Sequence, residues 1–358
     1  MQPRITKASP DAMKPKPTDV SKLGFGQIFT DHFFTMKYHI NKGWYDPVIE
    51  PYRSLKLDPA SMCFHYAQEI FESLKAYKNQ NGMVYLFRPA DNFHRMNASA
   101  RRLCMPEVDV DFTLRCLKNL VLLDNDWIPK ATGPALYIRA VMIATEPAVS
   151  VHPSNEYLFY IIMGPVGAYY PQGFNPTKIY VTREYVRAVR GGIGACKAAG
   201  NYAASLKAGE AASKMGYSQV LWLDALELKY VEEVGTSNIF FLIGDELITP
   251  NLSGSILPGI TRDSVIKMAK LWNMKVSERP LSIDEIMSAQ SKGNLKEAFA
   301  SGTAAIISPI GQIFYEGKEY VVNDGKTGTV SKKLYNELLQ IQYGEKEDLF
   351  GWRVPLTE

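Results

Sequence analysis

Hydrophobic residues recur along the chain with two periods, and the changes between them outline the expected elements. Apolar positions spaced three or four residues apart predict amphipathic helices, whereas short, nearly continuous apolar runs predict buried strands. The helical spacing predicts helices at 89–103, 112–123, 201–215, 263–272 and 329–342. The apolar runs predict strands at 83–87, 135–143, 157–163, 178–182, 219–223, 230–243 (with a bend at Gly235), 247–249 and 305–307.

Turn signals support this division into many short strands. Asn81-Gly82 precedes one predicted strand and Gly244-Asp245 separates two others, as in hairpins. Ser282 with Glu285 has the spacing of a capping box, which predicts a further helix. Short strands outnumber helices, which favours an α+β fold over a doubly wound parallel sheet.

The densest cluster of helix and strand breakers lies at 164–177 and predicts a linker between two domains. We therefore expect a smaller domain at 23–164, an interdomain linker at 165–177 and a larger domain at 178–358 that carries the candidate lysine described below. Residues 1–22 are rich in Lys and Pro and lack an apolar core, so they are expected to form a disordered N-terminal extension.

Composition narrows the class of protein. The chain has 358 residues, of which 46% are hydrophobic, and this is enough for a large core. A net charge of +3 with no basic block gives no indication of nucleic-acid binding. No apolar run reaches the roughly 18–20 residues of a membrane span. The four cysteines have no metal-ligand spacing and are expected to be reduced thiols in a cytoplasmic protein.

The most unusual stretch is 191–202, where Lys197 is surrounded by glycine, alanine and other small residues. Small residues allow a flat, bulky group to lie close to the backbone. A lysine that loses solvation favours its neutral amine, which makes Lys197 a candidate Schiff-base nucleophile. The structural alternative is a glycine-rich turn entering a helix, with a solvated lysine.

Several other polar features have ordinary explanations when each is taken alone. Arg95 could be a surface residue of its helix, Arg139 could form a structural salt bridge inside its apolar strand, and Glu233 could be a solvated carboxylate. The small-residue turns at 257–261 and 300–304 could be simple connections, although a turn that enters a helix can bind an anion. Together, a reactive lysine, a carboxylate, an arginine and two such turns suit pyridoxal phosphate.

The sequence resembles the branched-chain amino acid aminotransferases, which are pyridoxal-phosphate enzymes of the class IV aminotransferase family. The resemblance extends from about Leu23 to Trp352. It rests on His65-Tyr66, Phe71-Glu72, Leu86-Phe87-Arg88-Pro89, Leu136-Tyr137-Ile138-Arg139, Glu146-Pro147, Pro165-Val166-Gly167-Ala168-Tyr169, Tyr185-Val186-Arg187-Ala188, Lys197, Gly200-Asn201-Tyr202, Glu233-Val234-Gly235-Thr236, Leu257-Pro258-Gly259-Ile260-Thr261-Arg262 and Ser301-Gly302-Thr303-Ala304.

The resemblance implies a role for each matching residue. Lys197 would be the Schiff-base lysine and would move the substrate α-proton. The other cofactor-binding residues would be Arg95, Tyr202, Glu233, Ile260, Thr261 and Thr303. The substrate-binding residues would be Tyr66, Phe71, Tyr137, Arg139, Val151 (in the neighbouring subunit's site), Tyr169, Thr236 and Ala304. No metal is implied.

The resemblance also implies a two-domain fold type IV enzyme, with a smaller N-terminal α/β domain, a larger C-terminal pseudo-barrel domain and a homodimeric assembly. The expected reaction transfers the amino group of L-leucine, L-isoleucine or L-valine to 2-oxoglutarate, so the partners are small amino acids and 2-oxo acids. Ser73 and Ser150 replace glycines that are usual in the family. Ala305 and Ser308 replace the redox Cys-x-x-Cys of mammalian members.

Two kinds of alternative remain at this point. Within the same fold, D-amino-acid aminotransferase and aminodeoxychorismate lyase share the lysine and the glutamate. From a different class, the chain could bind the cofactor without catalysis.

Overall fold

The computed structural model describes residues 2–167 and 174–356, which divide into two compact units. The first unit contains the described residues up to 167, together with Cys196–Ala199 and the residues from Leu339 onward. The second contains the described residues 174–195 and Gly200–Leu338. We expected Lys197 to lie in the larger C-terminal domain, together with its neighbours in sequence. The segment Cys196–Ala199 instead belongs to the first unit.

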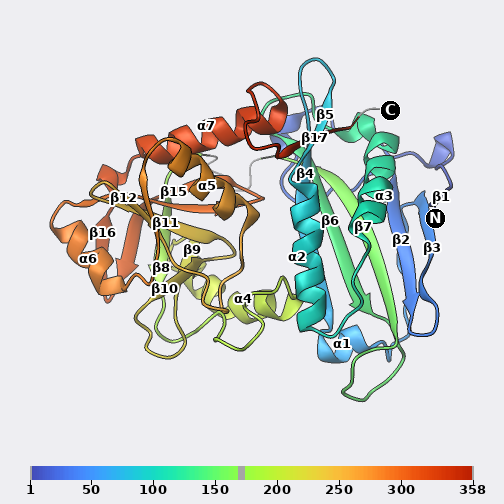
Figure 1. Cartoon of the computed structure of the whole chain (residues 1–358), viewed down its shortest axis with the longest axis horizontal. Coiled ribbons are helices and arrows are strands. Elements are labelled where there is room, and N and C mark those ends of the chain that lie inside the picture. Colours follow the sequence, from blue (N-terminus) through green and yellow to red (C-terminus); the bar gives the residue numbers. More distant parts are fainter. Residues whose placement is uncertain (1, 168–173, 357–358) are drawn as a thin grey trace. The chain divides into compact units, whose positions relative to one another are not determined.

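One sheet forms the core of the first unit (Figure 1). Among the described residues its strands follow the order β1 (Arg4–Ile5), β3 (Gly43–Pro51), β2 (His32–His39), β7 (Glu156–Val166), β6 (Ala135–Ala144), β4 (Glu69–Lys78), β5 (Val84–Phe87) and β17 (Arg353–Leu356). Neighbouring strands are antiparallel except for the parallel pair β1–β3. Successive side chains along each strand point to opposite faces of this sheet.

Helices cover one face of this sheet. Helix α2 (Pro89–Arg102) contacts β4, and α3 (Val110–Leu123) contacts both α2 and β2. The apolar positions that predicted α2, namely Phe93, Met96 and Ala100, are fully buried, as their helical spacing requires. The shorter helices of the unit are α1 (Met62–Tyr66), η1 (Pro10–Ala12), η2 (Val20–Lys22) and η3 (Asn125–Trp127).

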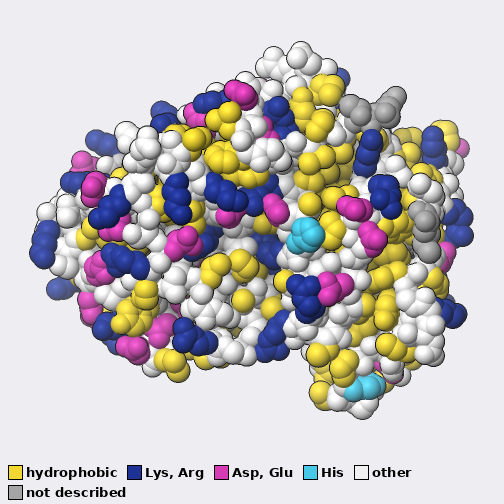
Figure 2. Space-filling view, in the orientation of Figure 1, with side chains coloured by type: hydrophobic (Ala, Val, Ile, Leu, Met, Phe, Trp, Pro, Cys, Tyr) yellow, Lys and Arg dark blue, Asp and Glu magenta, His cyan; other side chains and the backbone are white. Residues whose placement is uncertain are grey.

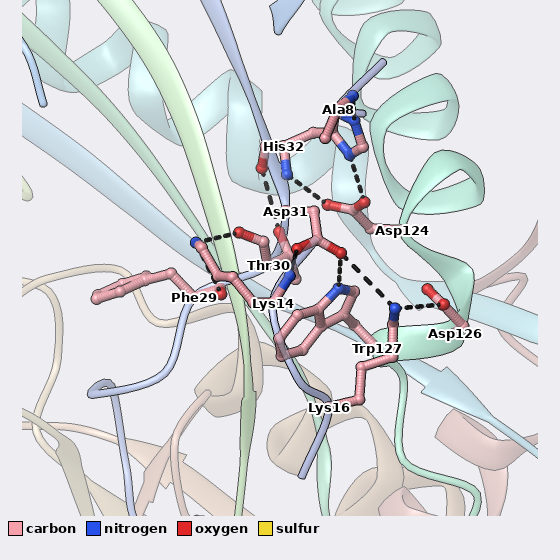
Figure 3. Close-up of polar contacts among 10 residues, drawn as sticks. All are labelled: Ala8, Lys14, Lys16, Phe29, Thr30, Asp31, His32, Asp124, Asp126 and Trp127. Carbon is pink, nitrogen blue, oxygen red and sulfur yellow. Dashed lines mark hydrogen bonds and ion pairs between the residues drawn. The ribbon is translucent and has the colours of Figure 1, made fainter. Parts of the chain in front are cut away.

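The N-terminal residues have defined positions, which differs from the expected disorder. Figure 3 shows how polar contacts attach them to the sheet. The buried carboxylate of Asp31 accepts hydrogen bonds from Lys14 N–H (2.8 Å) and from the indole N–H of Trp127 (2.7 Å). The ammonium group of Lys14 donates to the carbonyl oxygen of Thr30 (2.7 Å), and the amide of Ala8 donates to Nε2 of His32 (2.8 Å). The composition of residues 1–22 suggested that they bury too little apolar surface to be ordered. Hydrogen bonds to Thr30, Asp31 and His32 hold this segment against the sheet instead.

The second unit is built on a curled mixed sheet (Figure 1). Its strands follow the order β10 (Val231–Val234), β9 (Gln219–Leu223), β8 (Thr177–Val181), β15 (Ile306–Tyr315), β14 (Leu295–Gly302), β11 (Asn238–Ile243), β12 (Glu246–Thr249) and β13 (Lys275–Glu278), and β16 (Lys318–Val321) pairs with β15. Its helices are α4 (Ala199–Lys214), α5 (Ile260–Leu271), α6 (Ile283–Ser291), η4 (Asn323–Gly325) and α7 (Thr329–Tyr343), of which α4 begins and α7 ends in the first unit.

The expected helices are confirmed with boundary shifts of a few residues. The hydroxyl oxygen of the N-cap residue Ser282 accepts a hydrogen bond from Glu285 N–H, as predicted. The combination of largely antiparallel and mixed sheets with helices confirms the α+β class. Strand β7 continues to Val166, beyond its predicted end, because Gly164 allows the strand to lie against the backbone of Ile28 without a Cβ clash. No helix in residues 2–167 and 174–356 is long and apolar enough to cross a bilayer.

Candidate active site

The main chain of Lys197 is fixed to β4 and α2. Its carbonyl oxygen accepts a hydrogen bond from Phe71 N–H (3.0 Å), and its own amide donates to Oγ of Ser99 (3.0 Å). The next residue, Ala198, forms an isolated bridge with Ile70. The lysine backbone is therefore positioned by the strand that also carries Phe71.

The amine of Lys197 lies in a partly apolar environment inside the first unit. Its Nζ is 4.7 Å from the centroid of the Phe71 ring. Burial lowers the pKa of Lys197 to about 8, and the positive charge of Arg95 acts in the same direction, while Glu72 opposes both. The lowered pKa increases the neutral fraction of the amine near pH 7, which is the form that attacks a carbonyl group.

Arg95 is paired with a carboxylate that the sequence analysis did not select. Its Nε lies 2.7 Å from Oε1 of Glu72 and its Nη2 lies 2.9 Å from Oε2, which is a bidentate geometry. Asn92 also donates to Oε2 of Glu72 (2.8 Å). Burial alone would raise the pKa of the fully buried Glu72. The charge and hydrogen bonds of Arg95, with smaller contributions from Lys197 and Asn92, outweigh burial and lower it.

Phe71, Tyr137 and Arg139 lie on one face of the first sheet. Arg139 is opposite Ser73 in the register of β6 and β4, and Tyr137 is opposite Lys75, so these side chains share the face of Phe71. The guanidinium carbon of Arg139 lies 4.3 Å from the centroid of the Phe71 ring, and its Nη2 donates to the hydroxyl of Tyr137 (2.9 Å).

Arg139 has an unused polar group at this position. Its Nε is buried without a hydrogen-bond partner among the described residues. No carboxylate of residues 2–167 or 174–356 lies within ion-pair distance of its guanidinium, so the structural salt bridge considered from the sequence is not found there. Burial raises the pKa of Glu69, and the positive charge of Arg139 opposes that increase. A partly buried arginine whose Nε is buried and lacks an acceptor suits an anionic ligand.

In the second unit, Glu233 is buried at the end of β10. Its Oε1 accepts a hydrogen bond from Leu257 N–H (2.8 Å) and another from the side-chain amide of Asn238 (3.3 Å). Its Oε2 lies 3.1 Å from Nε of Arg187. Glu233 is therefore buried and held by three groups. The alternative considered from the sequence, a solvated carboxylate, is not found.

Two glycines permit this arrangement. Gly235 has φ of +54°, which favours glycine, and a Cβ there would overlap the side chain of Gln219. A Cβ on Gly259 would overlap the side-chain oxygen of Asn238. Gly259 directly precedes α5, whose first two residues are Ile260 and the buried Thr261. The first amides of a helix lack acceptors within the helix and can bind an anion.

The turns with Thr236, Thr303 and Ala304 lie at one end of the β11–β14 pair. Asn238 is opposite Ser301 in this pair, so the turn before β11 and the turn after β14 are adjacent. A Cβ on Gly302 would lie 3.1 Å from Oγ of Ser237, which places the two turns in close contact. The structure thus brings together the three residues expected at the substrate carboxylate and the phosphate.

The remaining predicted residues lie at separate positions. Tyr66 ends α1 and is partly exposed, and Val151 is 85% exposed in the loop between β6 and β7. Tyr202 is partly buried in the first turn of α4, in the second unit. Tyr169, predicted to line the pocket, lies outside the described residues.

Comparison with known proteins assigns the family. The sequence model of the family described as Amino-transferase class IV matches residues 69–313. Branched-chain-amino-acid aminotransferase 2 of Bacillus subtilis (strain 168) is 53% identical over 339 residues, which cover 95% of this chain and 93% of that protein. The chain belongs to the branched-chain-amino-acid aminotransferases of class IV.

Solved structures of branched-chain aminotransferases have the same fold. The Escherichia coli enzyme superposes with a TM-score of 0.74 at 27% identity, covering 91% of this chain and 99% of that chain. The Thermobaculum terrenum enzyme, solved in its PLP form, gives a TM-score of 0.75 at 24% identity, covering 93% and 100%. These likenesses confirm the predicted class IV fold.

Class IV aminotransferases use pyridoxal phosphate, and the residues described here fit that cofactor. Within the first unit, Lys197 has an amine with a lowered pKa. Within the second, Glu233 presents a buried carboxylate of the kind that can pair with a protonated ring nitrogen. The N-terminus of α5 supplies amides suited to a phosphate group.

Several residues that shape these groups had no role predicted from the sequence. Glu72, Ser99, Arg187 and Asn238 hold Arg95, Lys197 or Glu233 in place. Glu72 carried a detectable signal, because an ionisable residue between Phe71 and Ser73 in an apolar strand requires a partner. The partner itself comes from another element, so spacing along the chain could not identify it.

Proposed function

We propose that this chain catalyses the transfer of the amino group of L-leucine, L-isoleucine or L-valine to 2-oxoglutarate, giving branched-chain 2-oxo acids and L-glutamate. The observation that carries the proposal is the amine of Lys197, which has a pKa of about 8 beside the ring of Phe71. Family membership supports the same reaction, since the Bacillus subtilis relative is named for branched-chain amino acids.

The cofactor, when bound, supplies a protonated ring that can take up electrons from the substrate α-carbon. Lys197 Nζ is proposed to hold the cofactor and to take and return the α-proton. Glu233 keeps a proton on the ring nitrogen, supported by its own ion pair with Arg187. Tyr202 donates to the phenolic oxygen of the cofactor. The phosphate is assigned to Arg95, the amides of Ile260 and Thr261, and Thr303.

The same substrate pocket has to accept an apolar and an acidic side chain in turn. We assign its apolar walls to Tyr66, Phe71, Tyr137 and Tyr169, and the α-carboxylate to Thr236 and Ala304. Arg139 is assigned to the distal carboxylate of glutamate, because its Nε is buried and unpartnered. A cation stacked on Phe71 and bonded to Tyr137 can stay in place while leucine is bound.

A homodimer is part of this proposal. Val149 and Val151 are 70% and 85% exposed, and Phe64 of the neighbouring α1 is 61% exposed. This loop is joined to the start of α1 by the hydrogen bonds from Met62 N–H to Glu146 and from Ala148 N–H to Ala60. Figure 2 shows hydrophobic side chains gathered at the surface in this region. Such a patch suits a second copy of the chain, into whose pocket Val151 would reach.

We also propose a cytoplasmic location. The four cysteines, which are free thiols, support a reducing compartment.

A turnover assay over a panel of L- and D-amino acids with 2-oxoglutarate tests the activity. We expect glutamate to form with L-leucine, L-isoleucine and L-valine. Turnover restricted to D-amino acids, or release of pyruvate from aminodeoxychorismate without an amino acceptor, would assign the chain to one of its class IV neighbours instead.

A further inference from the structure

The second unit contains a cavity of about 310 Å³ that none of the proposed catalytic residues lines. Its walls come from β10, from the turn after β9 and from the segment between β12 and α5. This volume is at the lower end of the range for small-molecule sites, which is about 300–1,000 Å³. The cavity can therefore hold one small molecule.

One carboxylate at the wall of this cavity is incompletely satisfied. Glu232 is 6% exposed, and its Oε1 accepts a hydrogen bond from the hydroxyl of Ser255, which lines the same cavity. Its Oε2 is buried and has no hydrogen-bond partner among the described residues. A buried carboxylate oxygen without a donor is costly, so the missing partner is expected to come from outside the chain.

A backbone irregularity explains why Glu232 lines the cavity while the adjacent Glu233 does not. The register of β10 against β9 shifts between Val231 and Glu233, so Glu232 lies at a β-bulge. Bulges redirect side chains and often occur near binding sites. Glu232 bonds to Ser255, whereas Glu233 bonds to Leu257 and Asn238, so the two adjacent carboxylates have separate partners.

The charges around the cavity favour a cation. Asp224, Glu227 and Glu232 line it, against the single cation Arg190. The carboxylate of Asp224 accepts four backbone N–H bonds, and although burial acts to raise its pKa, these bonds lower it, so Asp224 remains ionised. Burial raises the pKa of Glu232, and the negative charges of Glu233 and Asp224 act in the same direction. The hydrogen bond from Ser255 and the positive charge of Arg187 oppose this rise without cancelling it.

The chemistry of the walls favours an organic cation over a metal ion. No group of three acidic, histidine or cysteine side chains in the described part of the chain could hold a metal. The apolar side chains of Val189, Leu226 and Ile256 line the same space. We propose that the cavity binds a small protonated amine, whose N–H donates to the Glu232 carboxylate and whose alkyl groups contact this apolar wall.

The test uses the holoenzyme and N,N-dimethylisobutylammonium chloride as the probe. A tertiary amine retains one N–H donor but cannot form an imine with a cofactor carbonyl group, so it does not react where Lys197 does. Isothermal titration in buffer matched for chloride is expected to show saturable 1:1 binding. Sodium isovalerate, an anion of similar size, is expected not to bind.

Glu232→Gln removes the charge but keeps an acceptor for Ser255, and it is expected to weaken binding of the probe at least tenfold. Glu210→Gln, an exposed carboxylate on α4 that does not line the cavity, is the control and should leave affinity unchanged. Absence of saturable binding to the wild type, or equal affinity in Glu232→Gln, would mean that the cavity holds only water and would overturn the proposal.

A second variant covers the case in which Glu232→Gln does not fold. Leu226 is 80% exposed at the cavity, so Leu226→Arg is expected to fold and to place a competing guanidinium group there. Probe binding should again weaken at least tenfold. Unchanged affinity in a folded Leu226→Arg protein would contradict the proposed site.

Discussion

Arg95 and Glu72 form a buried bidentate ion pair, with Nε–Oε1 and Nη2–Oε2 distances of 2.7 and 2.9 Å. The pair joins α2 to β4, the two elements that also hold the main chain of Lys197. The residue expected to bind a phosphate is thus oriented by a carboxylate on the strand of Phe71. This relationship gives Glu72 a positioning role that can be tested separately from catalysis.

Glu72→Gln is expected to destabilise the protein and to weaken cofactor binding, because Arg95 loses its charged partner. Removing one member of a buried pair typically costs about 3–5 kcal/mol of unfolding free energy. Chemical denaturation at neutral pH measures the stability loss, and equilibrium titration of the apoenzyme measures cofactor affinity. Wild-type stability and cofactor affinity in Glu72→Gln would show that Glu72 does not position Arg95.

The same pair predicts a pH dependence of stability. The pKa of Glu72 is lowered in the folded protein from its ordinary value of 4.5, so the folded state binds this proton less tightly than the unfolded state. Its stabilisation is therefore present above pH 4.5 and is lost as the pH falls toward the folded pKa. Denaturation midpoints measured between pH 6 and pH 3 should fall more steeply for the wild type than for Glu72→Gln. Parallel curves would contradict this contribution.

Lys197 is expected to become covalently attached to the cofactor after borohydride reduction. Capture of cofactor by the apoenzyme requires the neutral amine, so its rate should rise as the pH passes through about 8 and level off above it. Lys75 is an internal control, since burial also lowers its pKa to about 8. Peptide mapping should find the adduct at Lys197; an adduct at Lys75 would show that a lowered pKa alone selects the lysine.

Arg139→Met is expected to impair the glutamate half-reaction more than the leucine half-reaction. Hydrogen bonds to charged groups contribute about 1.5–3 kcal/mol, and about 1.36 kcal/mol is a factor of ten. The selective loss in kcat/KM should therefore be about 10- to 150-fold. Single-turnover measurements separate the two half-reactions. Equal losses in both would mean that Arg139 supports the pocket structurally.

Glu233→Gln is expected to reduce turnover far more than it reduces stability. The amide preserves volume and can still accept from Leu257, but it cannot balance the charge of Arg187 or of a protonated ring nitrogen. Comparison of kcat with the denaturation midpoint tests this, with the exposed Glu184→Gln as the control. Near-normal turnover in Glu233→Gln would remove the proposed role.

The local hydrophobic pattern was sufficient to predict most helices and strands. It did not predict which elements pair or which side chains meet. The spacing of Phe93, Met96 and Ala100 predicted α2 because helix burial has a fixed period. Strand β15 was predicted only at its start, because Pro309 and Gly311 interrupt the apolar run, although pairing with β8, β14 and β16 sustains the strand. Arg139 was correctly singled out as a charge in an apolar strand, but its stacking on Phe71 depends on the β4–β6 register, which spacing within one strand does not specify.

The strand order of the first sheet has a consequence for biosynthesis. Strand β17 pairs with β5, and the carbonyl oxygen of Trp352 accepts a hydrogen bond from Arg88 N–H, so this edge is built from residues about 265 positions apart in sequence. During translation the N-terminal strands emerge first, and β5 keeps an unpaired edge until the whole second unit has been synthesised. Until β17 is made, the nascent chain thus exposes a strand edge that can pair with other chains.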